Sequence, residues 1–181
     1  MIAAVRVAAE RKLPVGVQAT GHGASVPVTR VYISTRRMSD VRIDAAARSE
    51  RIDAGVRWEK VIREAGEHAL APLSGSASFV GAVSYLLGGG LGLLSRRYGL
   101  AADHILGFNL VTADGRFLQV TADQHPDLFW GVRGSKVNLG IVTSVDVRLF
   151  PVERVYGGGL FFPGEAAREV LNKYFAGTAT V

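Results

Sequence analysis

The sequence predicts an α+β fold, in which helices pack on several short strands. Three observations predict this class. Short apolar or alternating runs are separated by Asp, Pro and Gly turns. Two segments, 2–11 and 58–68, have apolar residues at helical spacing. Between them and the later strands lies a glycine-rich stretch at 73–105, and residues 69–95 carry no charge. With 181 residues, of which 48% are hydrophobic, the chain can bury a sizeable core.

The first half of the chain alternates short strands with helices. The helix at 2–11 is amphipathic, and a buried strand at 13–17 follows it and ends in the tight loop Thr20-Gly21-His22-Gly23. A histidine between two glycines at the end of a strand is held in a fixed place. The remaining predicted elements before the glycine-rich stretch are strands at 31–34, 41–43 and 49–52 and a helix at 58–68.

The second half begins with a predicted hairpin. An apolar strand at 105–112 is followed by Asp114-Gly115, a strong turn signal, and by a returning strand at 117–120. Pro126 begins a helix, and a loop at 133–140 leads into a clear alternating strand. The predicted elements from there to the end are strands at 141–150 and 155–162 and a helix at 165–174.

Composition and charge exclude several classes of function. The absence of cysteine excludes disulfides, iron–sulfur ligation and a thiol nucleophile. The net charge of +5 is scattered, with no basic run interleaved with aromatic residues, so we expect no nucleic-acid partner. The first nine residues contain Arg6 and enter a helical pattern directly, so we expect no signal peptide and a cytoplasmic protein. No metal site is expected, and the oligomeric state is left open.

The glycine-rich stretch has three interpretations. A membrane-spanning helix needs about 20 apolar residues. Pro72, the four glycines within 88–92 and several serines argue against that interpretation. A Rossmann loop needs G-x-G-x-x-G, but counting from Gly88 places the third glycine at Leu93, and an antiparallel hairpin follows in place of a parallel crossover. The third interpretation is a phosphate or flavin cradle of another fold, because exposed backbone N–H groups in such a turn suit phosphate oxygens.

Four ordered blocks resemble one enzyme family. They are VRVAAERKLPVGVQATGHGA at 5–24, LGGGLGLLSRRYGLAADHI at 87–105, LVTADGRF at 110–117 and HPDLFWGVRGSKVNLGIVTSVDVRLFPV at 125–152. Together they resemble the FAD-linked oxidases of the vanillyl-alcohol oxidase and berberine bridge enzyme type. The resemblance implies a PCMH-type FAD-binding domain of two α+β subdomains at 1–152, with FAD extended between them, and the beginning of a substrate domain at 153–181. It also implies that a preceding strand and helix and most of the substrate domain are missing.

The resemblance also implies site residues. The pyrophosphate loop corresponds to Ala19, Thr20, Gly21, His22, Gly23 and Ala24, with His22 as the covalent flavin ligand. Further flavin and pyrophosphate contacts correspond to Gly75, Ser76, Ser78 and Gly81, and contacts to the nucleotide half correspond to Asn138, Gly140 and Val142. Some relatives carry a second link through cysteine at the position of Ala77, which is impossible here. From the residues alone, the serines are also ordinary loop residues and Asn138–Val142 a plain turn into a strand.

The function implied by the resemblance is that of an FAD-dependent oxidoreductase. Such an enzyme transfers hydride from a small-molecule alcohol or amine carbon to flavin N5, with O₂ as the expected acceptor. No general base can be named, because Glu59, Glu64 and Glu67 have the pattern of solvated charges on a helix. The alternative is a truncated, non-catalytic remnant of the flavin fold that binds FAD weakly or not at all. Lys136 is assigned no chemistry at this stage.

Overall fold

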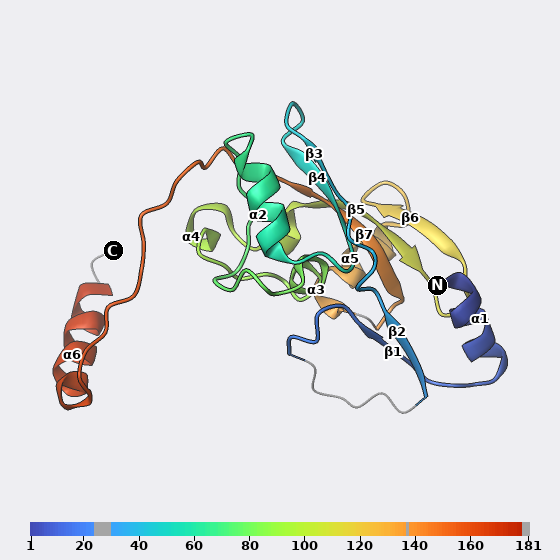
Figure 1. Cartoon of the computed structure of the whole chain (residues 1–181), viewed down its shortest axis with the longest axis horizontal. Helices are drawn as coiled ribbons and strands as arrows, with labels where there is room; N and C mark the ends of the chain where they lie inside the picture. Colours follow the sequence, from blue (N-terminus) through green and yellow to red (C-terminus); the bar gives the residue numbers. More distant parts are fainter. Residues whose placement is uncertain (24–29, 137, 179–181) are drawn as a thin grey trace.

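The structure is a computed structural model, and it describes residues 1–23, 30–136 and 138–178 (Figure 1). Its strands form two sheets, a parallel pair and a five-stranded antiparallel sheet. The predicted α+β class is confirmed. The strands are β1 (Val15–Gln18), β2 (Val31–Ser34), β3 (Val41–Asp44), β4 (Ser49–Asp53), β5 (Ile105–Val111), β6 (Phe117–Thr121) and β7 (Ile141–Arg148). The helices are α1 (Ile2–Glu10), α2 (Trp58–Gly66), α3 (Ala82–Leu86), α4 (Ser95–Tyr98), η1 (Ala101–His104), α5 (Pro126–Ser135), η2 (Gly164–Ala166) and α6 (Ala167–Thr178).

The large sheet has the strand order β3-β4-β7-β5-β6. The hairpin predicted at Asp114-Gly115 joins β5 to β6, and Gly115 takes the positive φ of +75° that this turn requires. Every neighbouring pair in this sheet is antiparallel, which overturns a Rossmann interpretation of the glycine-rich stretch. No helix in the described ranges is long and apolar enough to cross a membrane.

One face of the large sheet is apolar, and part of the other face is polar. The strand register places a row of hydrophobic side chains across all five strands on the same face, where they pack against α2, α3 and α5. On the opposite face Arg51 of β4 donates two hydrogen bonds to Asp146 of β7, at 2.7 and 2.8 Å. The row on the apolar face comprises Val41, Ile52, Val145, Phe108 and Val120.

The central strand β7 differs from its predicted pattern. In a regular strand Val142 and Ser144 would face the side opposite to Val145, yet each is only 5% exposed. The pairing of β5 with β7 shifts register between Asn109 and Leu110, so that Val142 lies opposite Leu110 and joins the same core cluster as Val145. Asn109 of β5 donates a hydrogen bond to Ser144 Oγ at 3.0 Å, which satisfies that buried hydroxyl.

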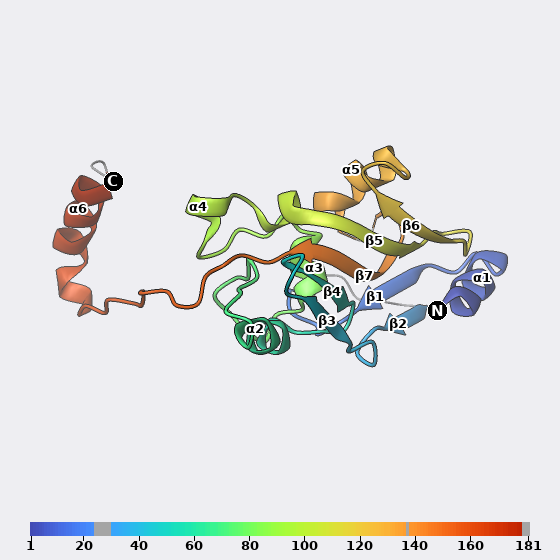
Figure 2. The same cartoon turned by 90° about the horizontal axis from the view of Figure 1, so that it is seen from above.

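The parallel pair forms a second, smaller unit with α1. Val5 of α1 and Ile33 of β2 pack against Val111 and Ile141, the ends of β5 and β7. In Figures 1 and 2 this unit lies at the end of the molecule that carries the N-terminus, beside the large sheet. Two α+β parts therefore adjoin one another, as the resemblance implied.

The segment 155–162 was predicted to be a strand, and this prediction was wrong. The segment is irregular and exposed, and Tyr156 and Phe161 lie almost fully in solvent. A strand needs a hydrogen-bonding partner, and none of the described strands pairs with it. The predicted helix after it is present as η2 and α6, which Figure 2 shows well apart from the sheets. The division at residue 152 stays a prediction.

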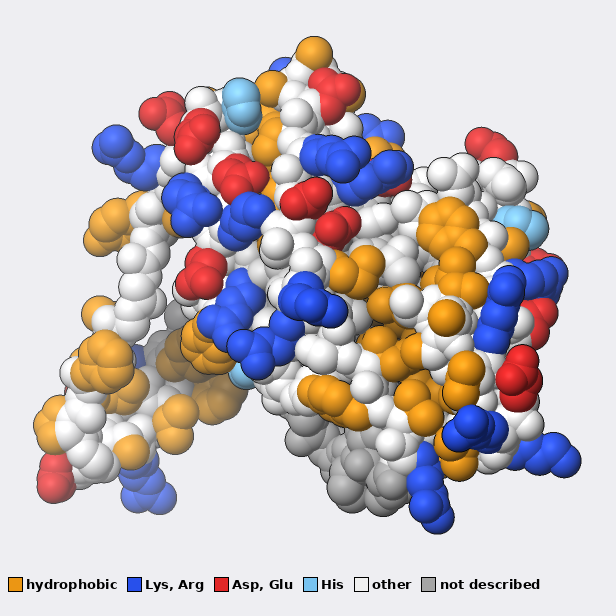
Figure 3. Space-filling view, turned by 45° about the vertical axis from the view of Figure 1, so that its right-hand side comes forward, with side chains coloured by type: hydrophobic (Ala, Val, Ile, Leu, Met, Phe, Trp, Pro, Cys, Tyr) orange, Lys and Arg blue, Asp and Glu red, His pale blue; other side chains and the backbone are white. Residues whose placement is uncertain are grey.

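Surface charge is distributed as the sequence indicated. In Figure 3, Lys and Arg side chains are interspersed with Asp and Glu and with apolar areas over the face shown. One hollow has Arg36, Arg57 and Lys60 among its lining residues, together with Glu59.

Candidate flavin site

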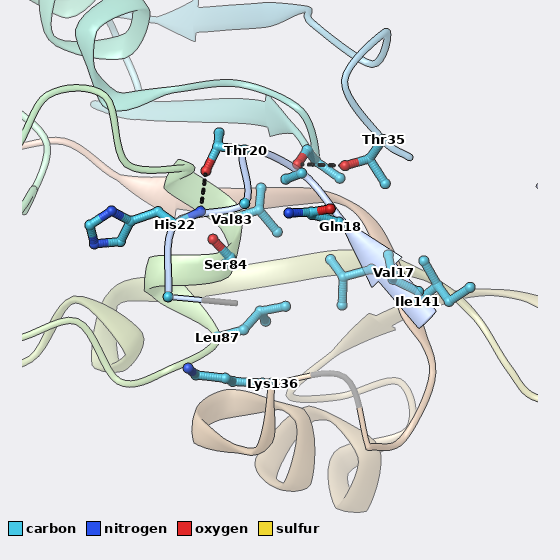
Figure 4. Close-up of a pocket in the computed structure, with 15 residues that line it drawn as sticks. Val17, Gln18, Thr20, His22, Thr35, Val83, Ser84, Leu87, Lys136 and Ile141 are labelled. Carbon is cyan, nitrogen blue, oxygen red and sulfur yellow. Dashed lines mark hydrogen bonds between the residues drawn. The ribbon is translucent and has the colours of Figure 1, made fainter. Parts of the chain in front are cut away.

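A hollow of about 200 Å³ lies between the two sheets, and Figure 4 shows its lining residues. One wall comes from β1 and the loop after it, another from α3 and another from the start of β7. Thr35 closes the back: it is buried, and its hydroxyl donates to Ala54 O at 3.1 Å. The lining residues include Val17, Gln18, Thr20, His22, Val83, Ser84, Leu87, Lys136, Ile141 and Val142.

The loop at 19–23 has the backbone that its glycines allow. Gly21 and Gly23 have φ values of +83° and +69°, which side-chain-bearing residues adopt only with strain. The His22 N–H between them points to Thr20 Oγ1 at 3.4 Å. The His22 side chain is exposed, and its ring lies edge-on to that of Phe79, with ring centroids 5.4 Å apart. The loop therefore presents both backbone and an accessible imidazole.

A second hollow, of about 420 Å³, begins where the first one ends. His22, Gly23, Ser84 and Lys136 line both hollows. The remaining wall of the second hollow is built from the chain around Gly75 and from the glycine-rich stretch. The remaining lining residues are Gly75, Ser76, Ala77, Val80, Tyr85, Gly88, Gly90 and Leu91.

Tyr85 contributes a phenol ring to the wall of the second hollow. Its hydroxyl is buried and has no hydrogen-bond partner among the described residues, and its ring lies edge-on to Trp58. Burial raises the pKa of this phenol above its ordinary value of 10. The phenol is therefore neutral at physiological pH.

The glycines of the stretch 88–92 have two structural roles, which are to allow close packing and to allow a positive φ. A Cβ at Gly90 would lie 2.7 Å from Ala101 Cβ, and one at Gly92 would lie 2.1 Å from Ser74 O. These two glycines permit contacts inside the protein. A Cβ at Gly89 would meet nothing within 4 Å, so its need for glycine rests on its φ of +101°.

The comparisons with known proteins decide the family. Residues 1–121 match the FAD binding domain family. The chain belongs to this family. FAD, the cofactor that the resemblance implied, is therefore the cofactor of this fold, and the two joined hollows are the candidate flavin site.

Several of the similar proteins are named as oxidases. (R)-6-hydroxynicotine oxidase of Paenarthrobacter nicotinovorans is 38% identical over 153 residues, which cover 83% of this chain and 33% of that protein. The crystal structure of 6-hydroxy-D-nicotine oxidase from Arthrobacter nicotinovorans superposes with a TM-score of 0.78 at 38% identity, covering 82% of this chain and 34% of that one. Glucooligosaccharide oxidase from Acremonium strictum, which carries a 6-S-cysteinyl, 8α-N1-histidyl FAD, superposes with a TM-score of 0.75 at 26% identity and covers 82% and 32%. The chain spans about a third of the length of these relatives.

Most of the predicted site residues surround the flavin site. Ala19 to Gly23 and Val142 line the first hollow, and Gly75 and Ser76 line the second. A Cβ at Gly81 would lie 3.3 Å from Thr20 Cγ2, so this glycine allows α3 to approach the loop. Ala24 lies outside the described residues.

The other predicted residues have structural contacts of their own. Ser78 O accepts a hydrogen bond from Glu59 N at 2.8 Å, and Asn138 Nδ2 donates to Ser135 O at 3.0 Å. A Cβ at Gly140 would lie 2.8 Å from Val111 O. Ser78 lines a separate hollow, and neither Asn138 nor Gly140 lines the two hollows of the flavin site. Their contacts to FAD stay a prediction.

The structure adds residues that sequence reasoning missed. Gln18, Ser84, Tyr85 and Lys136 all line the site, and Lys136 alone among its described lining residues carries a formal charge. The residues present suit FAD, because a glycine-bounded loop, two joined hollows and one cation lie along one path. One signal was available beforehand: Lys136 lies in the loop at 133–140, which also holds Arg133, two glycines and an asparagine.

Proposed function

We propose that this chain is the flavin-binding part of an FAD-dependent oxidoreductase that removes hydride from an alcohol or amine carbon of a small molecule. The observation that carries the proposal is the loop at 19–23, where two left-handed glycines present His22 at the meeting point of two hollows. The similarity to oxidases over most of this chain supports it. Bound FAD supplies the electron-pair acceptor at N5, and O₂ then takes up the electrons.

We also propose that His22 holds the cofactor covalently. The imidazole nitrogen of His22 would replace one hydrogen of the flavin 8-methyl group, and the two electrons and two protons released would pass to O₂, which would become H₂O₂. The exposed His22 ring lines the second hollow, and two glycines fix its backbone. The link keeps FAD in place and withdraws electron density from the ring, which favours hydride uptake. A cysteinyl link is impossible because the chain has no cysteine.

The test is made on this chain and on any longer protein that the neighbouring DNA encodes in the same reading frame. After incubation with FAD, acid precipitation should leave flavin fluorescence on the polypeptide, and the tryptic peptide with His22 should carry the added mass. His22→Ala should release all flavin on acid treatment. His68→Ala is the matched control, since His68 is also an exposed histidine but lies after α2, away from the site.

Three outcomes separate the possible roles. Flavin that appears only in the acid supernatant of the wild-type protein contradicts the covalent link but leaves cofactor binding standing. A protein that stays colourless after incubation with FAD contradicts cofactor binding and favours a non-catalytic remnant. Bleaching of the yellow protein by an alcohol or amine substrate, reversed by air, is the result expected for an oxidase.

A further inference from the structure

The two hollows of the flavin site meet at a shared wall. His22, Gly23, Ser84 and Lys136 are the residues common to both. FAD has adenosine at one end, the flavin ring at the other and a pyrophosphate with two negative charges between them. A dinucleotide that fills both hollows therefore has its charged middle at the shared wall. The only formal charge that the described lining residues bring to that wall is the ammonium group of Lys136.

Lys136 is held at that wall by an unusual backbone. Its φ of +58° and ψ of −114° are rare for a residue with a side chain. Its N–H donates to Leu87 O at 3.2 Å and the N–H of Gly134 donates to the same oxygen at 2.8 Å, so the turn is fastened to the end of α3. Such a conformation is strained and persists where the surroundings impose it, often at ligand sites.

The side chain of Lys136 passes close over Gly88. A Cβ at Gly88 would lie 3.2 Å from Lys136 Cε, closer than most real contacts, so the lysine stem passes over Gly88 at near van der Waals distance. Figure 4 shows the ammonium group at the same end of the first hollow as the His22 ring, with Leu87 between Lys136 and the loop. The fold therefore fixes the position of the Lys136 ammonium group at the site.

We propose that Lys136 binds FAD by neutralising its pyrophosphate, in addition to the backbone N–H groups of loop 19–23. The inference deepens the proposed flavin-binding function and rests on it. An ammonium group that donates to a phosphate oxygen forms a charge-assisted hydrogen bond. Loss of such a bond raises a dissociation constant about 10- to 150-fold. The effect should follow the phosphates and not the flavin ring.

A rival set of cations lies nearby. A separate hollow of about 300 Å³ is lined by Ala19 and Thr20 together with Arg36, Arg57 and Lys60. Lys60 Nζ donates to Ser39 O at 2.5 Å and is 3.8 Å from Glu64 Oε1, so this charge is already engaged. Neither Arg36 nor Arg57 lines the two hollows of the flavin site. The position of Lys136 therefore favours it as the neutralising charge.

The experiment measures Kd by calorimetry for three ligands: FAD, ADP, which has the pyrophosphate without the flavin, and riboflavin, which has the flavin without phosphate. Lys136→Met should raise Kd for FAD and ADP about 10- to 150-fold and leave riboflavin unchanged. Lys136→Arg should restore binding of ADP. Lys136→Gly removes the charge and also relieves the left-handed backbone, so it should lose ADP binding while unfolding at the same or a higher urea concentration.

Lys12→Met is the matched control. Lys12 is an exposed lysine with φ of +52° and lines neither hollow, so this change removes the same charge from a similar backbone. Its Kd for all three ligands should equal that of the wild-type chain. Arg57→Met tests the rival hollow and should weaken ADP binding by less than Lys136→Met does.

Three results would overturn the inference. They are a Kd for ADP within twofold of wild type in both Lys136→Met and Lys136→Gly, an equal loss of riboflavin binding, or a larger loss of ADP binding in Arg57→Met. If the wild-type chain binds none of the three ligands, the proposed flavin-binding function fails and this inference fails with it. Wild-type binding of FAD with unchanged variants rejects the role of Lys136 alone.

Discussion

Glu50 is a carboxyl group in an apolar place, and it makes the stability of the protein depend on pH. Its side chain is 2% exposed on the covered face of β4, where the register sets it between Ile43 of β3 and Val147 of β7. Neither carboxyl oxygen has a hydrogen-bond partner in the described part of the chain. Burial, and secondarily the charge of Glu64 on α2, raise the pKa of Glu50 well above its ordinary value.

The sign of the effect follows from the raised pKa. The folded protein keeps the Glu50 proton at pH values where the unfolded chain, with a pKa near 4.3, has lost it. The contribution of Glu50 to the free energy of unfolding is therefore fully present below about pH 4.3 and falls as pH rises through the raised pKa. One proton limits this fall to about 1.4 kcal/mol per pH unit. The loss levels off above the raised pKa.

Urea unfolding from pH 4 to 9, followed by the fluorescence of the buried Trp58, measures this. Glu50→Gln cannot ionise, so its free energy of unfolding should equal that of wild type near pH 4 and exceed it increasingly as pH rises. Glu50→Met also removes the unpartnered polar group, which should add about 1–3 kcal/mol. Glu67→Gln, an exposed carboxyl just after α2, should leave the pH dependence unchanged. A constant difference between Glu50→Gln and wild type across this range would refute the reasoning.

Two further predictions concern the glycine-rich stretch. Gly92→Ala should lower the free energy of unfolding by about 1–3 kcal/mol even without FAD, because its Cβ would lie 2.1 Å from Ser74 O and 2.8 Å from the Tyr85 hydroxyl; unchanged urea unfolding of the cofactor-free variant would show that this close approach is not needed for folding. Tyr85→Phe removes a buried hydroxyl that has no partner among the described residues, so it should keep or slightly raise the stability of the cofactor-free protein. A loss of more than about 1 kcal/mol in the same assay would mean that the hydroxyl has a partner.

Local patterns predicted most elements because their causes are local. The turn at Asp114-Gly115 needs only a residue that accepts positive φ, and the buried side of α2 needs only apolar residues one turn apart. The burial of Val142 on β7 was not predictable in this way, because it depends on a register shift in the pairing of β7 with β5. The segment 155–162 has the composition of a strand but no pairing strand among those described, and composition alone does not supply one.

The site was predictable to a similar degree. The loop at 19–23 could be recognised in the sequence, because the two glycines that flank His22 indicate a tight turn that fixes its backbone. Gln18 could be inferred from its place beside that loop. Ser84 and Lys136 could not, since a helix after the loop and a turn more than a hundred residues away reach the same hollow only through the packing of α3 on β4 and β7. A single sequence does not show that these segments come together at one hollow.

The glycine-rich stretch shows most clearly what a pattern leaves open. Dense glycines indicate that a backbone comes close to something, and the sequence favoured a cofactor as that partner. Gly90 and Gly92 approach Ala101, Tyr85 and the backbone at Ser74, so both permit close packing inside the protein, and Gly90 also lines the second hollow. Gly88 has a third purpose, since its missing side chain leaves room for the stem of Lys136. The stretch serves a ligand mainly through the residues that its glycines allow to come together, which is why substitutions there should first be tested for folding without FAD.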